Sequence, residues 1–417
     1  MHLLKLRALV VPISSSTFRA GAFPGGGRRT FKYLVQQSTI AESSRFAASG
    51  SATKDISSNK LQLFERTWTL SGSKPLEKLK LHLPGVTFIS SEDFEQADDD
   101  CMAKILVTSD SMETLEGMSV KSKFPYRTLL DFHPSPSTSR GNLVTEILLP
   151  RGVPGTNLGG LLHSLGVKGG GLVIVEDGVL ASGTIKLAAT KGGRLAIRLA
   201  EDVDVRKIQV AVANRSKVYL QAPNVSVRNR IEIAGIGSSE VHLQSQIGLS
   251  TPLVKIAIAG SGRVRVQAAS FAVDEMQSAI AGAGRIAIAG GEDTGSPVAV
   301  DTGGCNSHNV AIFGAGDVDC ADVVTKRASV AVAGQGTLAL EAQDALTLAA
   351  FGEAKLAYLL APPRMVTLKN YHVSSPPTPM SEEDRSIRNQ QKEVEAQELA
   401  DFWRSLPARE TALGVKN

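Results

Sequence analysis

The chain has 417 residues, of which 42% are hydrophobic and 21% charged, so it can build one large domain or two ordinary ones. Its formal net charge of +4 misleads, because residues 1–45 hold seven basic groups and one acid, leaving 38 basic and 40 acidic residues elsewhere. The body of the chain therefore gives no charge argument for nucleic acid binding. Three cysteines in this length also argue against a disulfide-built secreted domain.

The first 41 residues contain no acid, several arginines and many serines and threonines, as organellar transit peptides do. We predict a mitochondrial presequence over residues 1–45 and a polar linker over 46–60. A secretory signal is the competing interpretation, although its apolar core ALVVPI is short and interrupted by Pro12; a disordered basic tail is the third. No transmembrane segment is expected, because no apolar run reaches the ~18 residues that a membrane span needs.

Strand-like runs such as KLKLHL and AKILVTS follow over residues 61–152 and lack any glycine signature. We interpret this region as an N-terminal β lobe, either a capping sheet or irregular first coils of a repeat array. Residues 153–171 are rich in glycine but contain no phosphate-binding G-x-x-x-x-G-K-[ST] string. Regular strands with period two resume near Gly171, and we assign 153–370 to one glycine-punctuated β region.

One repeat dominates that region: a short apolar strand runs into Gly-x-Gly and out into another strand. It is clearest from Lys255 to Ala342, in IAIAGSGRVRV, AIAGAGRIAI, VAIFGAGDVDC and VAVAGQGTLAL, with a further copy, IEIAGIG, starting at Ile231. The glycines assigned to turns are Gly235, Gly237, Gly260, Gly262, Gly282, Gly284, Gly314, Gly316, Gly334 and Gly336. Glycine is suited to such turns because it adopts φ values that other residues avoid.

Alternation within each copy places Ile256 and Ile258 on one face, together with Val264 and Val266 after the turn. The first glycines are separated by 25, 22, 32 and 20 residues, as in stacked coils with loop insertions. We predict an all-β chain folded as a right-handed parallel β-solenoid. A β-sandwich is the alternative; the aromatic content of 5% and the constant phase of Gly-x-Gly disfavour it.

The recurring I-x-I-x-G-x-G-x-V/I units resemble the putative auto-transporter adhesin head GIN domain. The resemblance extends over about Leu61 to Leu368 and is strongest over 231–360. In that family an aspartate often follows the second glycine, and only Asp317 keeps it here, whereas Arg263, Arg285 and Thr337 depart from it. The resemblance implies a β-solenoid with an adhesive or scaffolding role, and it supplies no catalytic residues.

Three groups of residues resemble sites that carry chemistry. GAGRIA, from Gly282, matches the dinucleotide pattern G-x-G-x-x-A, but a strand pattern follows where a helix is required. Asp317, Asp319 and Asp322 lack the six or more oxygens of a calcium site, and we interpret them as a solvated acidic face.

Cys305, His308 and Cys320 do not complete a four-ligand zinc set, and Cys320 falls on the inward phase. We expect no catalytic residue, no cofactor and no metal.

Residues 371–417 form a proline-rich linker and a helical tail. The segment SEEDRSIRNQQKEVEAQELADFW predicts a helix capped by Ser381. Its thin apolar stripe comprises Ile387, Val394, Leu399, Phe402 and Trp403. The helix either rests on the last coil or remains available to a partner.

Small outward side chains mark a candidate interaction face made of Ala257, Ala259, Ala287, Ala289, Ala311, Ala331 and Ala333. The face is either covered by the chain's own first lobe or helix, or it binds a protein partner, a second copy included. We therefore predict a non-enzymatic structural or binding module. The alternative is a carbohydrate-active β-solenoid enzyme, which would need aligned outward carboxylates.

Overall fold

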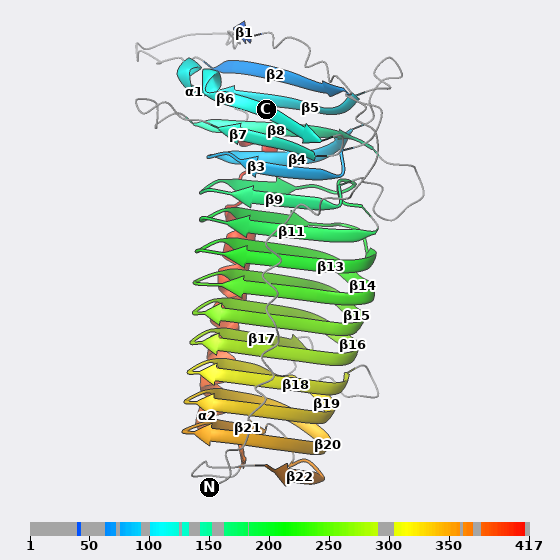
Figure 1. Ribbon diagram of the computed structural model, residues 1–417, viewed down its shortest axis with the longest axis vertical. Helices are drawn as coiled ribbons and strands as arrows, with labels where there is room; N and C mark the ends of the chain where they lie inside the picture. The colour runs from blue at the N-terminus through cyan, green and yellow to red at the C-terminus, as the bar shows by residue number, and fades with distance from the viewer. Residues whose placement is uncertain are drawn as a thin grey trace, which may run out of the picture. The chain divides into compact units, whose positions relative to one another are not determined.

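The computed structural model describes residues 40–42, 63–71, 76–92, 101–124, 127–132, 142–151, 162–181, 183–290, 304–358, 362–369 and 377–412, all within one compact unit, Val35–Asn417. Most of the presequence, the whole of the first linker and the linker at 370–376 lie outside these residues. Strands make up most of the described chain, so the all-β prediction is confirmed (Figure 1).

The strands form a stack of coils in which each residue pairs in parallel with its equivalent one coil away. Five long strands bend at a corner, so that the first part of each lies in one sheet and the second part in another. They are β14 (Lys217–Ile236), β15 (Glu240–Gly260), β16 (Arg263–Gly282), β19 (Asp317–Gly334) and β20 (Thr337–Gly352). The register of β14 with β15 shows both parts, since Val218 pairs with Val241 and Ile231 with Val254.

We call the sheet of the second parts sheet A and the sheet of the first parts sheet B. Sheet A also contains β7 (Arg127–Phe132), β3 (Lys78–His82), β9 (Ser164–Lys168), β11 (Thr184–Thr190), most of β13 (Val203–Ala213), β18 (Cys305–Gly314) and β22 (Met365–Leu368). Sheet B also contains β8 (Leu143–Pro150), β4 (Val86–Glu92), β10 (Leu172–Val175), β12 (Arg194–Arg198), β17 (Arg285–Gly290), β21 (Lys355–Tyr358) and β23 (Thr378–Pro379).

The first lobe joins this stack and closes its end. β3 pairs in parallel with β9, and β4 with β10, so coils begin well before Gly171. An insertion between β4 and β9 then reverses the direction of pairing: β5 (Cys101–Ser109) is antiparallel to β8 and to β2 (Phe64–Ser71), and β6 (Met118–Phe124) to β7. β1 (Ile40–Glu42) pairs antiparallel with β2. In the chain, α1 (Met112–Glu116) lies between β5 and β6. Antiparallel strands thus cover the core where parallel coils stop.

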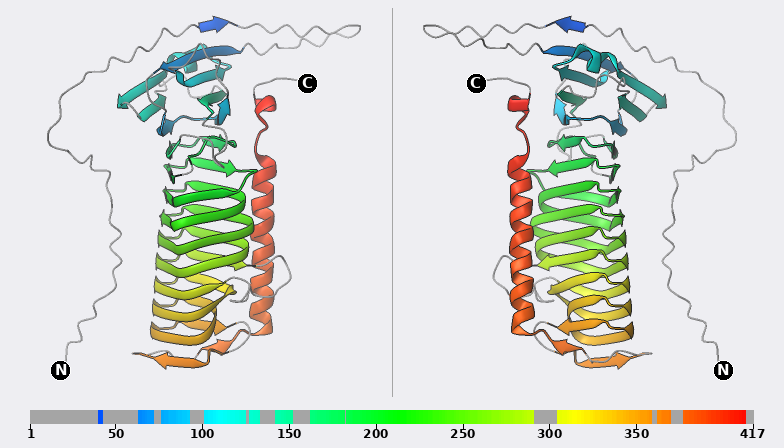
Figure 2. Two further views of the ribbon diagram at one scale, coloured as in Figure 1. Left: turned by 90° about the vertical axis from the view of Figure 1, so that its right-hand side faces the viewer. Right: turned by 90° about the vertical axis from the view of Figure 1, so that its left-hand side faces the viewer.

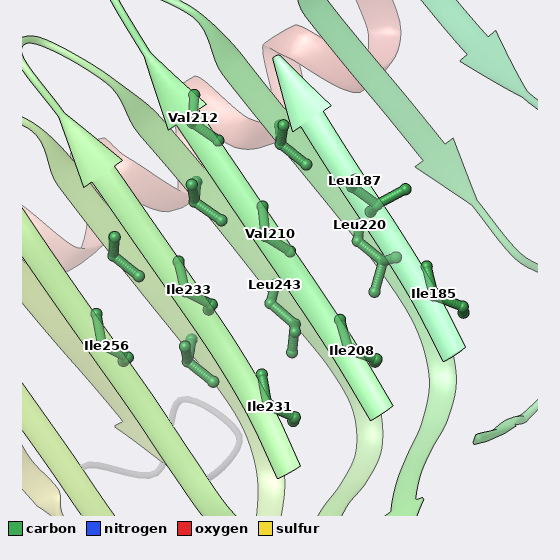
Figure 3. Packing of buried hydrophobic residues seen from close by; sticks show 14 of the residues in the cluster. Ile185, Leu187, Ile208, Val210, Val212, Leu220, Ile231, Ile233, Leu243 and Ile256 are labelled. Carbon is green, nitrogen blue, oxygen red and sulfur yellow. The ribbon is translucent and has the colours of Figure 1, made fainter. Parts of the chain in front are cut away.

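The core runs between the two sheets as columns of aliphatic side chains. Figure 3 shows Ile185, Ile208 and Ile231 at equivalent positions of successive coils of sheet A. The predicted inward residues are buried: Ile288 is 1% exposed and Val332 is 3% exposed. Each such side chain contributes about 1.5–3 kcal/mol when it is fully buried, so the repeated columns supply the stability of the stack.

Glycines form the edge at which sheet A returns to sheet B. Gly334 has a φ of 128°, and a Cβ atom added there would lie 2.4 Å from the carbonyl oxygen of Gly314 in the preceding coil. At the second position of the motif, a Cβ on Gly316 would lie 2.6 Å from Cγ2 of buried Ile280. The earliest copy is offset: Gly235 lies inside β14 opposite Ile258, and Gly237, with a φ of 73°, occupies the turn.

The tail forms α2 (Glu382–Ser405) and α3 (Arg409–Ala412). Ser381 caps α2 as predicted, because its Oγ accepts a hydrogen bond of 3.0 Å from the backbone N–H of Asp384. Figure 2 shows that α2 lies alongside the stack rather than across its last coil. No helix among the described residues is long and apolar enough to cross a membrane.

Candidate interaction surfaces

The outer face of sheet A carries a continuous column of alanines. They are aligned by the parallel register of successive coils, one alanine per coil. We call this set the alanine column: Ala188, Ala211, Ala234, Ala257, Ala279, Ala311, Ala331 and Ala349. None of its members is buried.

A second outward column lies two residues further along each strand, and we call it the phenylalanine column. It comprises Ala213, Ile236, Ala259, Ala281, Phe313, Ala333 and Phe351. Its two largest members have high exposed fractions, 72% for Phe313 and 68% for Phe351. Aromatic rings at this exposure are costly to leave in water, which favours an interaction surface.

A polar column flanks the alanine column on its other side and changes character along the stack. Its first half contains charged residues, among them Lys186, Glu232 and Lys255, and Lys207 pairs with Glu232 at 2.8 Å. Its second half is uncharged and comprises Gln277, Asn309, Ser329 and Thr347.

The three columns on β16, β18, β19 and β20 therefore give twelve outward positions with no charge. We call these positions the uncharged patch.

The outer face of sheet B differs, because α2 covers it. The outward residues beneath the helix are aligned in one column, which we call the helix column. They are Glu146, Phe88, Ile174, Ala196, Tyr219, His242, Arg265, Ala287, Asp319, Ala339 and Ala357.

Ion pairs attach the part of α2 from Arg388 to Glu395 to sheet B. Arg388 donates from Nε to both carboxylate oxygens of Asp319 at 2.9 Å, and its Nη2 lies 2.9 Å from Asp322 Oδ1. Glu395 accepts from Arg265 at 2.9 Å. Arg388, Asp319, Asp322 and Arg265 are all less than 10% exposed, so removing one partner would leave a buried charge without compensation.

Aromatic rings attach the second half of α2. Tyr219 stacks on Phe402 with 3.7 Å between ring centroids, and Trp403 meets both rings edge to face. Leu399 is buried between these rings and the ion pairs. Beyond α2, Arg409 forms an ion pair with Glu146 of β8. The helix is thus attached along most of the stack, by charge at one end and by stacking at the other.

Burial under the helix changes several pKa values. Burial raises the pKa of Asp317, although a hydrogen bond from Thr337 opposes it. Burial tends to lower the pKa of Arg388, but the carboxylates of Asp319 and Asp322 outweigh it and raise that pKa. Burial also tends to raise the pKa of Glu240, yet hydrogen bonds from His242 and Lys217 bring it down to about 2. These shifts favour the charged forms of Arg388 and Glu240, whereas the raised pKa of Asp317 favours its neutral form.

The seven predicted alanines do not share one face. Five of them lie in two adjacent columns of sheet A: Ala257, Ala259, Ala311, Ala331 and Ala333. Ala287 and Ala289 lie on sheet B, and Ala287 is 9% exposed beneath α2. The physical reason is the turn: these two alanines follow the glycines of their coil, whereas the other five precede them. Of the two alternatives for this face, coverage by the chain's own helix therefore applies to Ala287. Accessibility to a partner applies to the five alanines of sheet A, none of which is buried.

The prediction about the tail holds in part, and the one about the acids is wrong. Leu399 of the apolar stripe is buried and Phe402 stacks on Tyr219, whereas Ile387 is 47% exposed and Val394 is 58% exposed. Asp319 and Asp322 are not a solvated acidic face, because Arg388 and Lys392 of α2 pair with them. The signal that was missed is charge: Arg388, Lys392 and Glu395 follow helical spacing and complement the acids and arginines of sheet B.

The remaining constellations lie in the core or at turns. GAGRIA runs from the end of β16 into β17, a strand, as the sequence predicted. Cys305, His308 and Cys320 are all buried, and His308 Nε2 lies 2.9 Å from Ser278 Oγ. Within the described part of the chain, no three His, Cys, Asp or Glu side chains are grouped as metal ligands would be.

Residues 188–362 match the model of the family described as "Putative auto-transporter adhesin, head GIN domain". The resemblance carried by the Ile-x-Ile-x-Gly-x-Gly copies is therefore confirmed over the coils from β11 to β21. No curated protein matches the chain in sequence.

Similar solved structures include a "putative adhesin" of Parabacteroides distasonis, 14% identical with a TM-score of 0.38, covering 76% of this chain and 98% of that one. Another is a "putative adhesin" of Parabacteroides merdae, 12% identical with a TM-score of 0.40, covering 76% and 96%. A third is a "putative lipid binding protein" of Parabacteroides distasonis, 14% identical with a TM-score of 0.38, covering 76% and 97%.

Proposed function

We propose that this chain, whose residues 188–362 match the head GIN family, is a non-enzymatic binding module on a right-handed β-solenoid with Gly-x-Gly turns. The outer face of sheet B binds the chain's own helix α2. Sheet A is the docking face for a protein partner. The family's description as an adhesin head supports a binding role.

One observation carries this proposal: the uncharged patch, which includes exposed Phe313, occupies a regular sheet face. Exposed sheet faces normally carry charged residues that keep them solvated and prevent association. Alanine side chains have no rotamers to lose on binding, so a partner that covers them pays little conformational entropy. A flat, neutral face with projecting aromatic rings is what a protein interface core presents.

No finding supports the alternative of a carbohydrate-active enzyme. Such an enzyme needs a pair of accessible carboxylates aligned across a groove. The outward aspartates of the repeat region have other partners here, because Asp319 pairs with Arg388, and Asp317 lies 3.4 Å from Arg285. We infer that these acids anchor the helix rather than act on a substrate.

The family description favours a secreted or surface location for this binding module. The predicted mitochondrial destination depends on residues 1–45, nearly all outside the described residues, and has no support from the family. A carboxy-terminal fluorescent fusion tests the inference in cells that express the protein. We expect signal at the surface or in the medium, and signal in mitochondria would overturn it.

The docking function is tested by photo-crosslinking in cells that express the protein. A photoreactive phenylalanine analogue replaces Phe313 on sheet A or, as the matched control, Val394, which is 58% exposed on α2. We expect a cross-linked adduct of defined mass from position 313 and none from position 394. The Ala331→Lys change in the same chain should abolish the adduct. No adduct at 313, or equal adducts at both positions, would overturn the proposal.

A further inference from the structure

We propose that the occupant of sheet A is a second copy of this chain, packed face to face about a two-fold axis that runs parallel to the strands between β18 and β19. This inference rests on the proposed function, that sheet A is a docking face. It is carried by the sizes of the outward residues in the uncharged patch, which are complementary to themselves under this rotation.

The phenylalanine column supplies the first part of the fit. A rotation about that axis reverses the order of the coils and keeps each column opposite its own copy. β18 then faces β19 of the second copy, and β16 faces β20. Phe313 lies over Ala333 of the second copy. The ring therefore meets a methyl group, and the relation holds in both directions, as an isologous interface requires.

The polar column fits the same two-fold arrangement, independently of the phenylalanine column. In the same arrangement Asn309 faces Ser329 of the second copy, and Gln277 faces Thr347. Each pair joins a longer amide to a shorter hydroxyl. Both amides donate one hydrogen bond to Glu275 Oε1 of their own chain, and their carbonyl oxygens can accept from the hydroxyls of the second copy. Between these two columns alanines meet alanines, so nothing prevents the two sheets from approaching closely. Strands of the two copies run in nearly the same direction, as in aligned sheet packing.

Charge argues for the same occupant. The twelve positions of the uncharged patch carry no charge, and the carboxylate of Glu275 at its edge already accepts hydrogen bonds from Gln277 and Asn309. Charged groups of a partner placed over the patch would be left unpaired on binding. A second uncharged patch brings no such cost. The charged part of the polar column, with Glu232 and Lys255, lies beyond β16 and therefore outside the centre of the contact.

The contact area between the two copies sets the expected affinity of the dimer. With coils about 4.8 Å apart and three outward positions per strand, four coils cover roughly 300 Å² per copy, and neighbouring coils raise this to roughly 500 Å². A total of about 1,000 Å² lies at the low end for specific interfaces, where association is weak. The dimer should therefore form at micromolar or higher concentrations of chain.

The test uses the full chain in sedimentation velocity over a concentration series, with charge substitutions that depend on the register. Ala331→Lys should raise the dimer dissociation constant at least about tenfold, because each copy buries an unpaired lysine. Mixing Ala331→Lys with Ala311→Glu should restore a dimer of the two variants, since these positions face each other. Mixing Ala331→Lys with Ala279→Glu, which faces β20, should not.

The outcomes separate this inference from the proposed function. A parent that stays monomeric at all concentrations, or an Ala331→Lys variant that dimerises as the parent does, overturns the second copy as occupant. Rescue by Ala279→Glu as strong as by Ala311→Glu overturns the arrangement. A photo-adduct at position 313 with a mass other than two chains would retain the docking function and overturn only its occupant. Unchanged melting temperatures of the variants show that they are folded.

Discussion

Sheets A and B are made from alternate halves of the same repeat, and their inward columns are alike, yet their outer faces have opposite roles. Sheet B presents Asp319, Arg265 and Tyr219 to the chain's own helix. Sheet A presents alanines and exposed Phe313 to solvent. The comparison shows that the inward half of the repeat determines the fold, whereas the outward half determines what each sheet contacts.

The strongest test of this comparison sets an inward residue against an outward one. Ile288→Asp should lower the free energy of unfolding by about 4 kcal/mol, because it buries a carboxylate that has no partner. Phe313→Asp on the exposed face should change it by about 0.5 kcal/mol or less. Urea unfolding measures both. If Ile288→Asp unfolds as the parent does, the assignment of inward and outward positions is wrong.

The next test removes the charge that attaches α2. Arg388→Ala leaves buried Asp319 and Asp322 without their shared partner, a loss of about 3 kcal/mol for a buried pair. Because α2 can detach while the coils stay folded, we expect faster amide hydrogen exchange over Glu382–Ser405. Arg404→Ala is the matched control, since Arg404 pairs with exposed Asp401 on the same helix. Equal exchange in both variants would mean that stacking alone holds α2.

The pH dependence of the free energy of unfolding separates the interior behind sheet A from the charged exterior of sheet B. His308 is buried behind sheet A, and burial lowers its pKa to about 4. Below the unfolded value of 6.5, the unfolded chain binds a proton that the folded chain does not, so stability is lost as pH falls from 6.5 toward 4. The slope is about 1.4 kcal/mol per pH unit.

The variant His308→Gln keeps a hydrogen-bonding atom near Ser278 and removes the titration. Between pH 6.5 and pH 5 the parent should lose about 2 kcal/mol more than this variant. Urea unfolding at the two pH values gives both losses. Equal losses of unfolding free energy in the parent and in His308→Gln would show that His308 is protonated in the folded state.

The inward half of the fold could be predicted from the sequence because strand alternation is local. Ile256 and Ile258 are two residues apart, and the side-chain period of a strand fixes their common face. The pairing of β3 with β9 could not be predicted, since the insertion that separates them leaves no local pattern. The repeat of its motif predicts a turn at Gly235, whereas the turn requires a positive φ, which Gly237 has.

The outer faces could be predicted only in part. Small residues next to Gly-x-Gly indicated an unusual surface, but alternation alone does not tell which sheet a residue joins after the chain turns. The docked side of α2 could be predicted only in part, because an amphipathic pattern assumes apolar docking. Here the helix docks in part through Arg388 and Glu395, whose partners are far away in the sequence.

The smallest effects come from the two alanines that best separate the sheets. Ala287→Lys places an ammonium group under α2 on sheet B, and we expect a loss of about 1–2 kcal/mol with faster hydrogen exchange in the helix. Ala331→Lys on sheet A should change stability by about 0.5 kcal/mol or less, since that alanine is exposed. Thermal unfolding and exchange measured on both variants make the comparison. A large loss from Ala331→Lys would mean that sheet A is covered within one chain, and the docking face would then have to be sought elsewhere.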